Sequence, residues 1–294
     1  MGKRVFLFVA TNIAIVFTLT IVLSVLGVSS GITPGGLDVG ALAVFCLIWG
    51  MAGSFISLQI SRWIAKRATG VRLVDPRTGN PEATWLYSTV ERLTRQAQLP
   101  MPEVGIYDSP EVNAFATGPS KSRSLVAVSS GLLRALRPDE VEGVLAHEVA
   151  HIANGDMVTM TLLQGVVNAF VMFFARLIAH FITRTGEGRS SSGGMYFLVV
   201  IVLQLALGIL GSMITSWFSR QREFRADYGG ATLAGREKML GALRRLAANS
   251  QLVDTRHEAL ATMKINGGTG RWMLLFHTHP PIEVRIAALE HARH

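Results

Sequence analysis

Four stretches of the chain, each longer than twenty residues, consist almost entirely of apolar and small side chains. They cover residues 5–28, 39–60, 157–182 and 195–218. A helix needs about 20 apolar residues to cross the hydrocarbon core of a bilayer, so each stretch is predicted to be a transmembrane helix. The pattern is weakest in the third stretch, which contains Gln164, Asn168, Arg176 and His180.

The first stretch could instead be a signal peptide, because Lys3 and Arg4 precede it. Its apolar run, however, is longer than the core of about 7–15 residues that a signal peptide has. No A-x-A cleavage site follows it, and the second stretch begins about ten residues later. The sequence therefore favours a retained transmembrane helix.

The distribution of Lys and Arg predicts the orientation of these helices. Residues 29–38 contain no Lys or Arg, and residues 183–194 contain only two. The other flanks of the spans are basic, at Lys3, Arg4, Arg62, Lys66, Arg67, Arg220, Arg222 and Arg225. Because basic flanks stay on the cytoplasmic side, both termini and the polar regions 61–156 and 219–294 are predicted to face the cytoplasm.

The two polar regions are predicted to form one compact cytosolic domain, whose halves are separated in sequence by the third and fourth spans. Asn80 and Pro81 open a helix with apolar residues at helical spacing, and Pro138 followed by two acids opens another. Short strands are predicted at residues 104–107, 113–117 and 124–128. The expected fold is a mainly α integral membrane protein, with four transmembrane helices and a cytosolic α+β domain that contains a small sheet.

Composition narrows the function further. Hydrophobic residues make up 49% of the chain and charged residues only 16%, which excludes a disordered or fibrous protein. Cys46 is the only cysteine, so a disulfide framework and a cysteine-rich zinc site are excluded. The net charge of +8 reflects the basic flanks of the spans, and no Gly-rich phosphate-binding motif is present. We therefore expect neither a nucleic acid nor a nucleotide as a partner.

The strongest chemical signal is the segment His147-Glu148-Val149-Ala150-His151. Two histidines four residues apart share one face of a helix, where two imidazole nitrogens can bind a single zinc ion. Glu148 follows the first histidine and can accept a proton from a water at that ion. The alternative is a surface helix with two solvated histidines. Against it, apolar neighbours predict that one side of the helix is buried, namely Val141, Val144, Leu145 and Ile152.

A catalytic zinc ion needs a third protein ligand. Glu223 and Asp227 are spaced so that both lie on one helical face, and one could bind the metal while the other supports a histidine. They could equally belong to a charged surface helix and pair with Arg222 and Arg225. Other candidates for the third ligand are Asp156, His180, His277 and His279.

Three segments of the chain, AHEVAHIANGDMVTMTLLQGVVN, WFSRQREFRADYGGATLAGREKM and HTHPPIEVRIAAL, resemble the HtpX family of bacterial membrane metalloproteases. That family is related to the eukaryotic CAAX prenyl proteases, and both follow an HExxH…ExxxD zinc-site pattern. The resemblance implies one zinc ion per chain with His147, His151 and Glu223 as ligands. It also implies that Glu148 is the general base and that Asp227 orients a histidine ligand.

Two further segments match this family more loosely. The residues Asn113, Ala114, Phe115 and Ala116 resemble an edge strand that binds the substrate backbone by adding a strand to the sheet; an ordinary half-buried strand is the alternative. His279, in a His-Pro-Pro segment, resembles a histidine that stabilises the oxyanion during catalysis. A capping or core histidine before a helix that begins with proline is equally compatible with the sequence.

The resemblance implies a zinc endopeptidase of the bacterial inner membrane. Its active site would lie in the cytosolic domain, and its substrates would be damaged or misassembled membrane proteins in quality control and the stress response. An intramembrane protease is disfavoured, because charged Asp139, Glu140 and Glu142 precede the motif. A zinc transporter or a non-proteolytic scaffold with a metal site remains the alternative, although three of the four spans contain no ionisable residue that transport would need.

Overall fold

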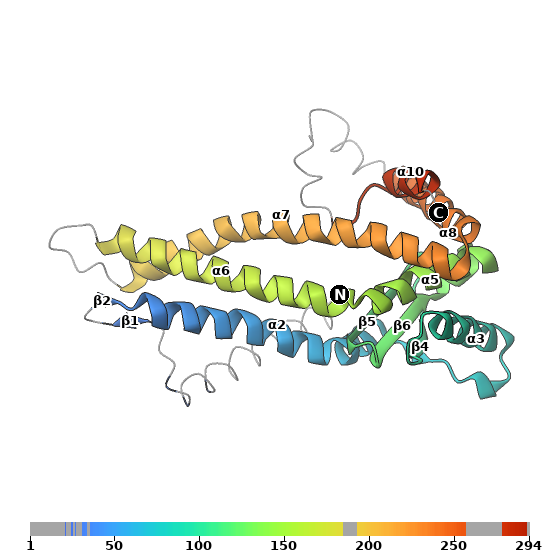
Figure 1. Cartoon of the computed structure of the whole chain (residues 1–294), viewed down its shortest axis with the longest axis horizontal. Coiled ribbons are helices and arrows are strands. Elements are labelled where there is room, and N and C mark those ends of the chain that lie inside the picture. The colour runs from blue at the N-terminus through green and yellow to red at the C-terminus, as the bar shows by residue number, and fades with distance from the viewer. Residues whose placement is uncertain are drawn as a thin grey trace. The chain divides into compact units, whose positions relative to one another are not determined.

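The computed structural model describes residues 31–33, 36–184, 193–256 and 278–292, together with the isolated residues 21, 25 and 27. The chain divides into two compact units, each assembled from two separate parts of the sequence. The first contains Met1–Leu58 and Thr159–Thr215, and the second contains Gln59–Val158 and Ser216–His294. Figure 1 shows the elements of both units in the order of the chain.

Long helices make up the first unit within the described part of the chain. They are α2 (Val39–Thr69), α6 (Asp156–Arg184) and the first half of α7 (Gly193–Ala234). A short hairpin of β1 (Ile32–Thr33) and β2 (Gly36–Leu37) precedes α2. All three helices are long and apolar enough to cross a membrane, and each contains one of the predicted spans. The span expected at residues 5–28 lies outside the described residues.

Small residues let these helices approach one another closely. A Cβ atom added at Gly50 of α2 would lie 2.7 Å from the Gly165 carbonyl oxygen of α6. At Gly211 of α7 it would lie 2.7 Å from the Val167 side chain of α6. Such close backbone contacts are typical of helices that pack within a bilayer, where van der Waals contact drives association.

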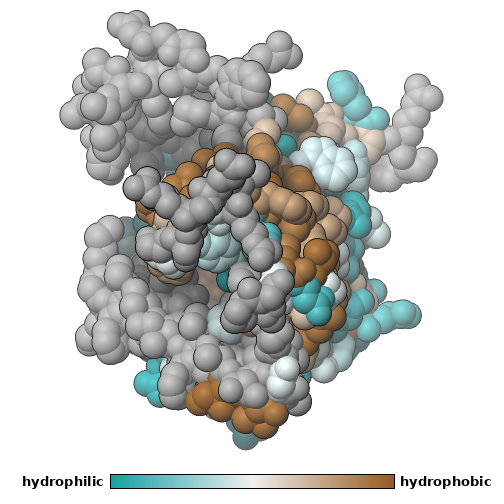
Figure 2. Space-filling model, turned by 90° about the vertical axis from the view of Figure 1, so that its left-hand side faces the viewer, coloured by the Kyte–Doolittle hydropathy of each residue, from teal (hydrophilic) through white to brown (hydrophobic). Residues whose placement is uncertain are grey.

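The outer faces of these helices are apolar. Within the most apolar windows of α2, α6 and α7, only 17%, 22% and 11% of residues are buried, so most of these side chains face outward. Figure 2 shows hydrophobic side chains, in brown, over a large part of the surface that is not grey, with hydrophilic residues between them. An exposed apolar surface of this extent indicates contact with lipid. Along α7 it includes Phe197, Leu198, Leu205, Ile209, Leu210, Ile214 and Trp217.

The second unit contains a four-stranded mixed sheet in the order β3-β4-β6-β5. Its strands are β3 (Arg72–Leu73), β4 (Glu103–Tyr107), β5 (Ala114–Ser120) and β6 (Arg123–Ser129). The pair β4 and β6 is parallel, whereas β3 with β4 and β5 with β6 are antiparallel. The three strands expected from the sequence are present, and β5 is an edge strand of the described sheet.

Helices cover this sheet and complete the unit. They are α3 (Pro81–Gln96), α4 (Ser130–Ala135), α5 (Pro138–Asn154), the end of α7, α8 (Arg236–Arg256) and α10 (Ile282–His291), with the short 3-10 helix η1 (Pro76–Thr78) before α3. Asn80 caps α3 as expected, since its side chain accepts from the Glu82 and Ala83 amides. The core lies between α3, β6 and α5, and it contains Leu86, Val90, Leu93, Val126, Val128, Leu145, Val149 and Ile152.

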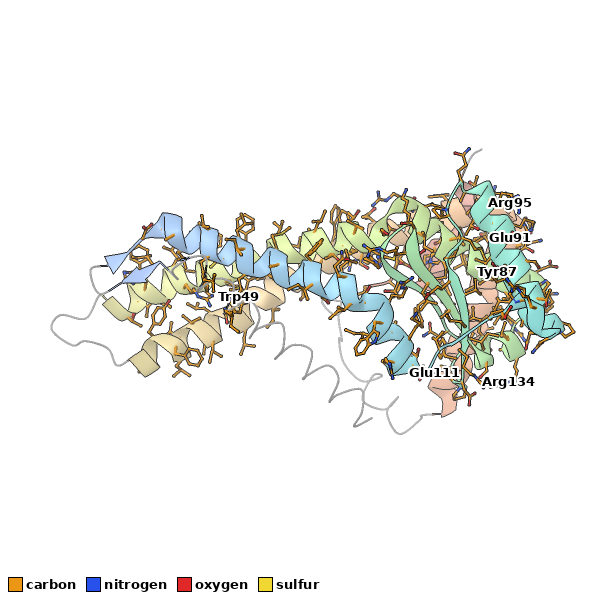
Figure 3. All side chains as sticks on the ribbon, turned by 90° about the horizontal axis from the view of Figure 1, so that it is seen from below. Trp49, Tyr87, Glu91, Arg95, Glu111 and Arg134 are labelled. Carbon is orange, nitrogen blue, oxygen red and sulfur yellow. The ribbon has the colours of Figure 1, made fainter. Side chains whose placement is uncertain are left out.

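The opposite face of α3 is polar. Tyr87, Glu91 and Arg95 follow one another along this helix in Figure 3. Tyr87 is half-buried and packs against the core, whereas Glu91 and Arg95 are exposed. A side-chain nitrogen of Arg95 lies 3.2 Å from a carboxylate oxygen of Glu91 across one helical turn. Exposed pairs of this kind add little to stability, so α3 is held mainly by its apolar face.

Candidate metal centre

Helix α5 presents His147 and His151 on one face. It begins with Pro138 at its first position, where the Glu140 carboxylate accepts from the Arg137 amide at 2.8 Å. It ends at Gly155, whose φ of 69° suits a glycine C-cap. The two imidazole rings lie 4.6 Å apart, and their Nε2 atoms are separated by 3.1 Å. The predicted pair of adjacent histidines is thus present.

The third member of the group comes from α7. Glu223 is 1% exposed, and its carboxylate oxygens lie 3.4 Å from His151 Nε2 and 3.6 Å from His147 Nε2. Two glycines allow α7 to approach α5 this closely, because a Cβ atom at Gly229 would lie 2.7 Å from the Ala150 Cβ and one at Gly230 would lie 3.1 Å from the His147 amide nitrogen. The sequence alternative of a charged surface helix does not fit so deeply buried a carboxylate.

Carboxylates also contact the other nitrogen of each imidazole. Asp227 Oδ1 lies 3.0 Å from His147 Nδ1, and Asp156 Oδ2 lies 2.6 Å from His151 Nδ1. An ionised carboxylate can only accept, so each Nδ1 donates, and in a neutral imidazole this leaves Nε2 as an acceptor. Asp156 was one of the candidates for the third ligand. It instead contacts Nδ1 of His151, the ring nitrogen that faces away from the Glu223 carboxylate.

With both imidazoles neutral, three acceptors therefore face one another, namely the two Nε2 atoms and the Glu223 carboxylate. The Nε2 atoms of His147 and His151 converge with the Glu223 carboxylate, and the buried Glu223 Oε1 has no hydrogen-bond partner among the described residues. Burying a carboxylate oxygen without a partner is costly. Two imidazoles and one carboxylate at this spacing could hold a metal ion, which would satisfy all three acceptors.

Burial and hydrogen bonding act in opposite directions on these histidines. Burial alone lowers the pKa of His151, but its hydrogen bond to Asp156 and the negative charge of the nearby Glu223 carboxylate outweigh burial and raise that pKa to about 9. The pKa of His147 is likewise raised, because hydrogen bonds to Asp227 and Glu223 outweigh the effect of burial. The surrounding carboxylates thus favour a cation at both imidazoles, whether that cation is a proton or a metal ion.

Arg285 of α10 takes part in this network, although the sequence analysis did not single it out. Its Nη2 and Nε atoms donate to the two Asp227 carboxylate oxygens at 2.6 and 2.8 Å. Its Nη1 lies 3.4 Å from Glu223 Oε2. The fork of an arginine matches a carboxylate in this way, so Arg285 fixes the carboxylate that contacts His147. In the sequence, the only signal for this role of Arg285 is that it lies six residues after His279.

Glu148 lies beside the histidine pair, half-buried, on the wall of a cavity of about 200 Å³. The same cavity is lined by Asn113 and Ala114 at the start of the edge strand β5. The next two residues of the strand differ in orientation, since Phe115 packs against Tyr107 at a ring distance of 5.7 Å, whereas Ala116 packs on the main core. The predicted substrate strand therefore borders the predicted general base.

His279 lies on the rim of the same cavity. Its side chain is 64% exposed, and its Nδ1 is 2.9 Å from Glu223 Oε2. A core histidine would be buried, and the residue at the N-cap of α10 is Pro281, so neither structural alternative from the sequence fits. His180 belongs to α6 in the first unit, and His277 lies outside the described residues.

The fold itself is shared with a solved structure. The crystal structure of Ste24p from S. mikatae matches 98% of this chain with a TM-score of 0.65 and 19% sequence identity. The chain spans 64% of the length of that protein. Apolar helices that expose their side chains, and a buried group able to hold a metal ion beside an open sheet edge, define the class as a membrane-associated metallopeptidase.

Comparison with sequence families makes the assignment specific. Peptidase family M48 matches residues 80–293. Protease HtpX of Idiomarina loihiensis is 51% identical over 99% of this chain and 100% of its own length, and a Protease HtpX homolog of Bacillus licheniformis is 52% identical over 99% of both chains. The chain belongs to peptidase family M48. These relatives confirm the expected family and favour a protease over the transporter or scaffold.

Proposed function

We propose that this chain is a zinc endopeptidase in which His147, His151 and Glu223 bind one zinc ion. The observation that carries this proposal is the convergence of two imidazole nitrogens and a buried carboxylate oxygen that has no partner among the described residues. Nitrogen and oxygen donors in this number are what a catalytic zinc site uses, with one further position left for water or substrate.

Zinc, when bound, supplies Lewis-acid chemistry that polarises a peptide carbonyl and makes water a nucleophile near neutral pH. Glu148 takes the proton from the attacking water and delivers it to the leaving amine. Its place next to His147 and on the cavity wall supports this role. Asp227 and Asp156 hold the two imidazoles in the orientation that leaves each Nε2 free to bind the metal.

The substrate lies along β5. This strand pairs with β6 on one side only among the described strands, so its other edge offers unpaired backbone groups to an extended peptide. We assign Asn113, Ala114, Phe115 and Ala116 to the substrate backbone, because the first two of them line the cavity that also contains Glu148. His279, exposed on the rim, is assigned to the oxygen of the scissile carbonyl, where it stabilises negative charge.

The cellular role follows from the membrane helices and the relatives. We assign four spans, at residues 5–28, 39–60, 157–182 and 195–218, and place both termini and the catalytic domain, formed by residues 61–156 and 219–294, in the cytoplasm. The host membrane is the bacterial inner membrane, and the substrates are damaged or misassembled membrane proteins. The proteins named Protease HtpX that align over the full chain support this assignment.

The test uses the full chain purified in detergent. We expect about one zinc ion per chain by elemental analysis, and cleavage of an unfolded membrane protein that stops on chelation and returns when zinc is added. Added magnesium should not restore cleavage, because magnesium prefers oxygen ligands in octahedral geometry. Cleavage that persists after the metal has been removed would contradict the proposal.

A further inference from the structure

The cavity beside Glu148 has two chemically different ends. Its charged lining residues, Glu148, Glu223 and Arg285, all belong to the metal centre described above. The imidazoles of His147 and His279 lie at this charged end as well. Apart from Asn113, the remaining described lining is apolar, and it comes from α4, α5, α8, the first residue of β5 and the residues just before that strand. The side chains of this apolar end include Leu132, Val144, Met239, Leu243 and Leu246.

Volume limits what this cavity can hold. It measures about 200 Å³, whereas pockets for whole small-molecule ligands have about 300–1,000 Å³. An apolar cavity of about 150 Å³ is large enough for a benzene molecule. This volume includes the end at the metal centre. The cavity at Glu148 therefore has room for no more than one side chain such as leucine, methionine or phenylalanine, with the rest of the peptide outside.

The position of the cavity relates it to the peptide. Ala114 is the first residue of the edge strand β5 and also lines the cavity. A peptide that extends along this edge has side chains that alternate between the two faces of the sheet. One of them would enter the cavity while the peptide backbone lies next to Glu148 and the metal ligands.

We infer that this cavity binds the substrate side chain adjacent to the scissile bond and selects a medium-sized apolar one. The inference rests on the proposed peptidase function and adds to it the class of residue at which the enzyme cuts. A charged substrate side chain is excluded, because it would lose its hydration against Leu132, Val144 and Leu246 without a partner in that end of the cavity. Alanine fits but leaves most of the volume empty.

The first measurement maps cleavage sites. The full zinc-loaded chain in detergent is given a mixture of denatured proteins, and the products are sequenced by mass spectrometry. Peptides that differ only at the selected position are then compared. We expect kcat/KM for leucine or phenylalanine to exceed that for alanine, aspartate or lysine by at least 10-fold, since one methylene in an apolar pocket changes kcat/KM about 10–200-fold.

The second measurement changes the cavity. Leu246 on α8 is half-buried and lines it, so Leu246→Trp narrows the cavity and Leu246→Ala enlarges it. Leu246→Trp should lower kcat/KM for the phenylalanine peptide about 10-fold relative to the alanine peptide, and Leu246→Ala should shift the preference toward tryptophan. Leu133 is also half-buried against the same core but does not line the cavity, so Leu133→Trp and Leu133→Ala are matched controls that should leave the preference unchanged.

The outcomes separate the two claims. Zinc-dependent cleavage without any preference for apolar residues contradicts the pocket and leaves the peptidase function intact. The Leu246 variants and the Leu133 variants are compared at equal zinc content. If the Leu246 variants keep the wild-type substrate preference, this result also contradicts the inference that the cavity selects the substrate side chain. Absence of cleavage by the wild-type chain contradicts the peptidase function and with it the inference.

Discussion

At the scale of single residues, the metal centre depends on carboxylates that never contact the metal. Asp156 holds His151, and Asp227, which is itself held by Arg285, holds His147. A hydrogen bond to Nδ1 fixes both the tautomer and the rotation of an imidazole, so its loss leaves the ligand in place but poorly directed. In the proposed site, we therefore expect the affinity for zinc to depend on residues beyond the three ligands.

Asp156→Asn tests this support. The substitution keeps the size of the side chain and removes the charge that stabilises the donated Nδ1 proton of His151, so we expect zinc affinity to fall about 10–100-fold. Asp139→Asn on α5, the helix that carries His151, is the matched control, because Asp139 is exposed and its ion pair with Lys238 lies at the surface. Competition with a zinc-binding dye measures both affinities. Equal affinities for the two variants would show that Asp156 does not support the ligand.

The raised pKa of His151 predicts how pH acts on the metal-free protein. A pKa raised from 6.5 to about 9 by Asp156 and Glu223 stabilises the fold fully below pH 6.5, and this contribution is lost as the pH rises through 9. The thermal midpoint of the zinc-free chain should therefore fall between pH 7 and 9.5. The increase caused by zinc should grow over the same window, since fewer protons compete for the imidazole.

Scanning fluorimetry at a series of pH values, with and without zinc, measures both effects. His151→Gln is the control, because glutamine does not titrate and the variant should show a shallower decline. A zinc-free midpoint that rises over this window would contradict the assigned ionisation.

At the scale of elements, the centre depends on how closely α7 crosses α5. Gly229 marks this crossing, because a Cβ atom there would lie 2.7 Å from the Ala150 Cβ. Pushing the two helices apart would move Glu223 away from His147 and His151. The positions of the proposed ligands thus depend on the contact between Gly229 and Ala150, although neither residue can bind a metal ion through its side chain.

Gly229→Ala should reduce zinc occupancy, and the double variant Gly229→Ala/Ala150→Gly should restore most of it by removing the clashing methyl group. Gly208→Ala on the same helix is the control, since nothing lies within 4 Å of a Cβ at that position. Zinc content after dialysis at a fixed free-zinc concentration measures the effect. Failure of the double variant to recover, with Ala150→Gly alone fully loaded, would show that the crossing is not set by this contact.

The helices and strands, and several residues of the site, could be predicted from the sequence. Which faces of these elements pack against one another could not. Helical spacing put His147 beside His151, and the Asn80-Pro81 pair indicated where α3 begins. Spacing alone left Glu223 undecided, because it does not say which face of α7 meets α5. Arg285 was missed for the same reason, as it contacts Asp227 across 58 positions of sequence, and only packing brings them together.

At the scale of the whole molecule, both parts of the ligand set are continuous with membrane helices. Helix α5 leads through Gly155 into α6, and the single helix α7 contains both an apolar stretch and Glu223. This continuity suits the proposed substrates, which are membrane proteins.

The proposed topology can be tested with fused reporters that work only outside the cytoplasm. Because the loops near residues 34 and 191 contain few or no basic residues, reporters there should be active. Reporters at Arg95 and at the C-terminus should be inactive, while a reporter that works only in the cytoplasm should give the reverse pattern. Activity of the extracytoplasmic reporter at the C-terminus would mean an odd number of spans and contradict the assigned topology.

The most direct test of the account compares two acids of the same centre, Glu148 and Glu223. Glu148→Gln keeps the shape of the side chain but cannot accept a proton, so zinc should remain near one per chain while cleavage falls by roughly 10²–10⁴. Glu223→Ala leaves two histidines, too few for a stable site, and should lose both zinc and cleavage. Elemental analysis measures the zinc content and a proteolysis assay measures cleavage, both on variants whose circular dichroism spectrum is unchanged. Loss of zinc from Glu148→Gln, with Glu223→Ala still loaded and active, would contradict the assignment.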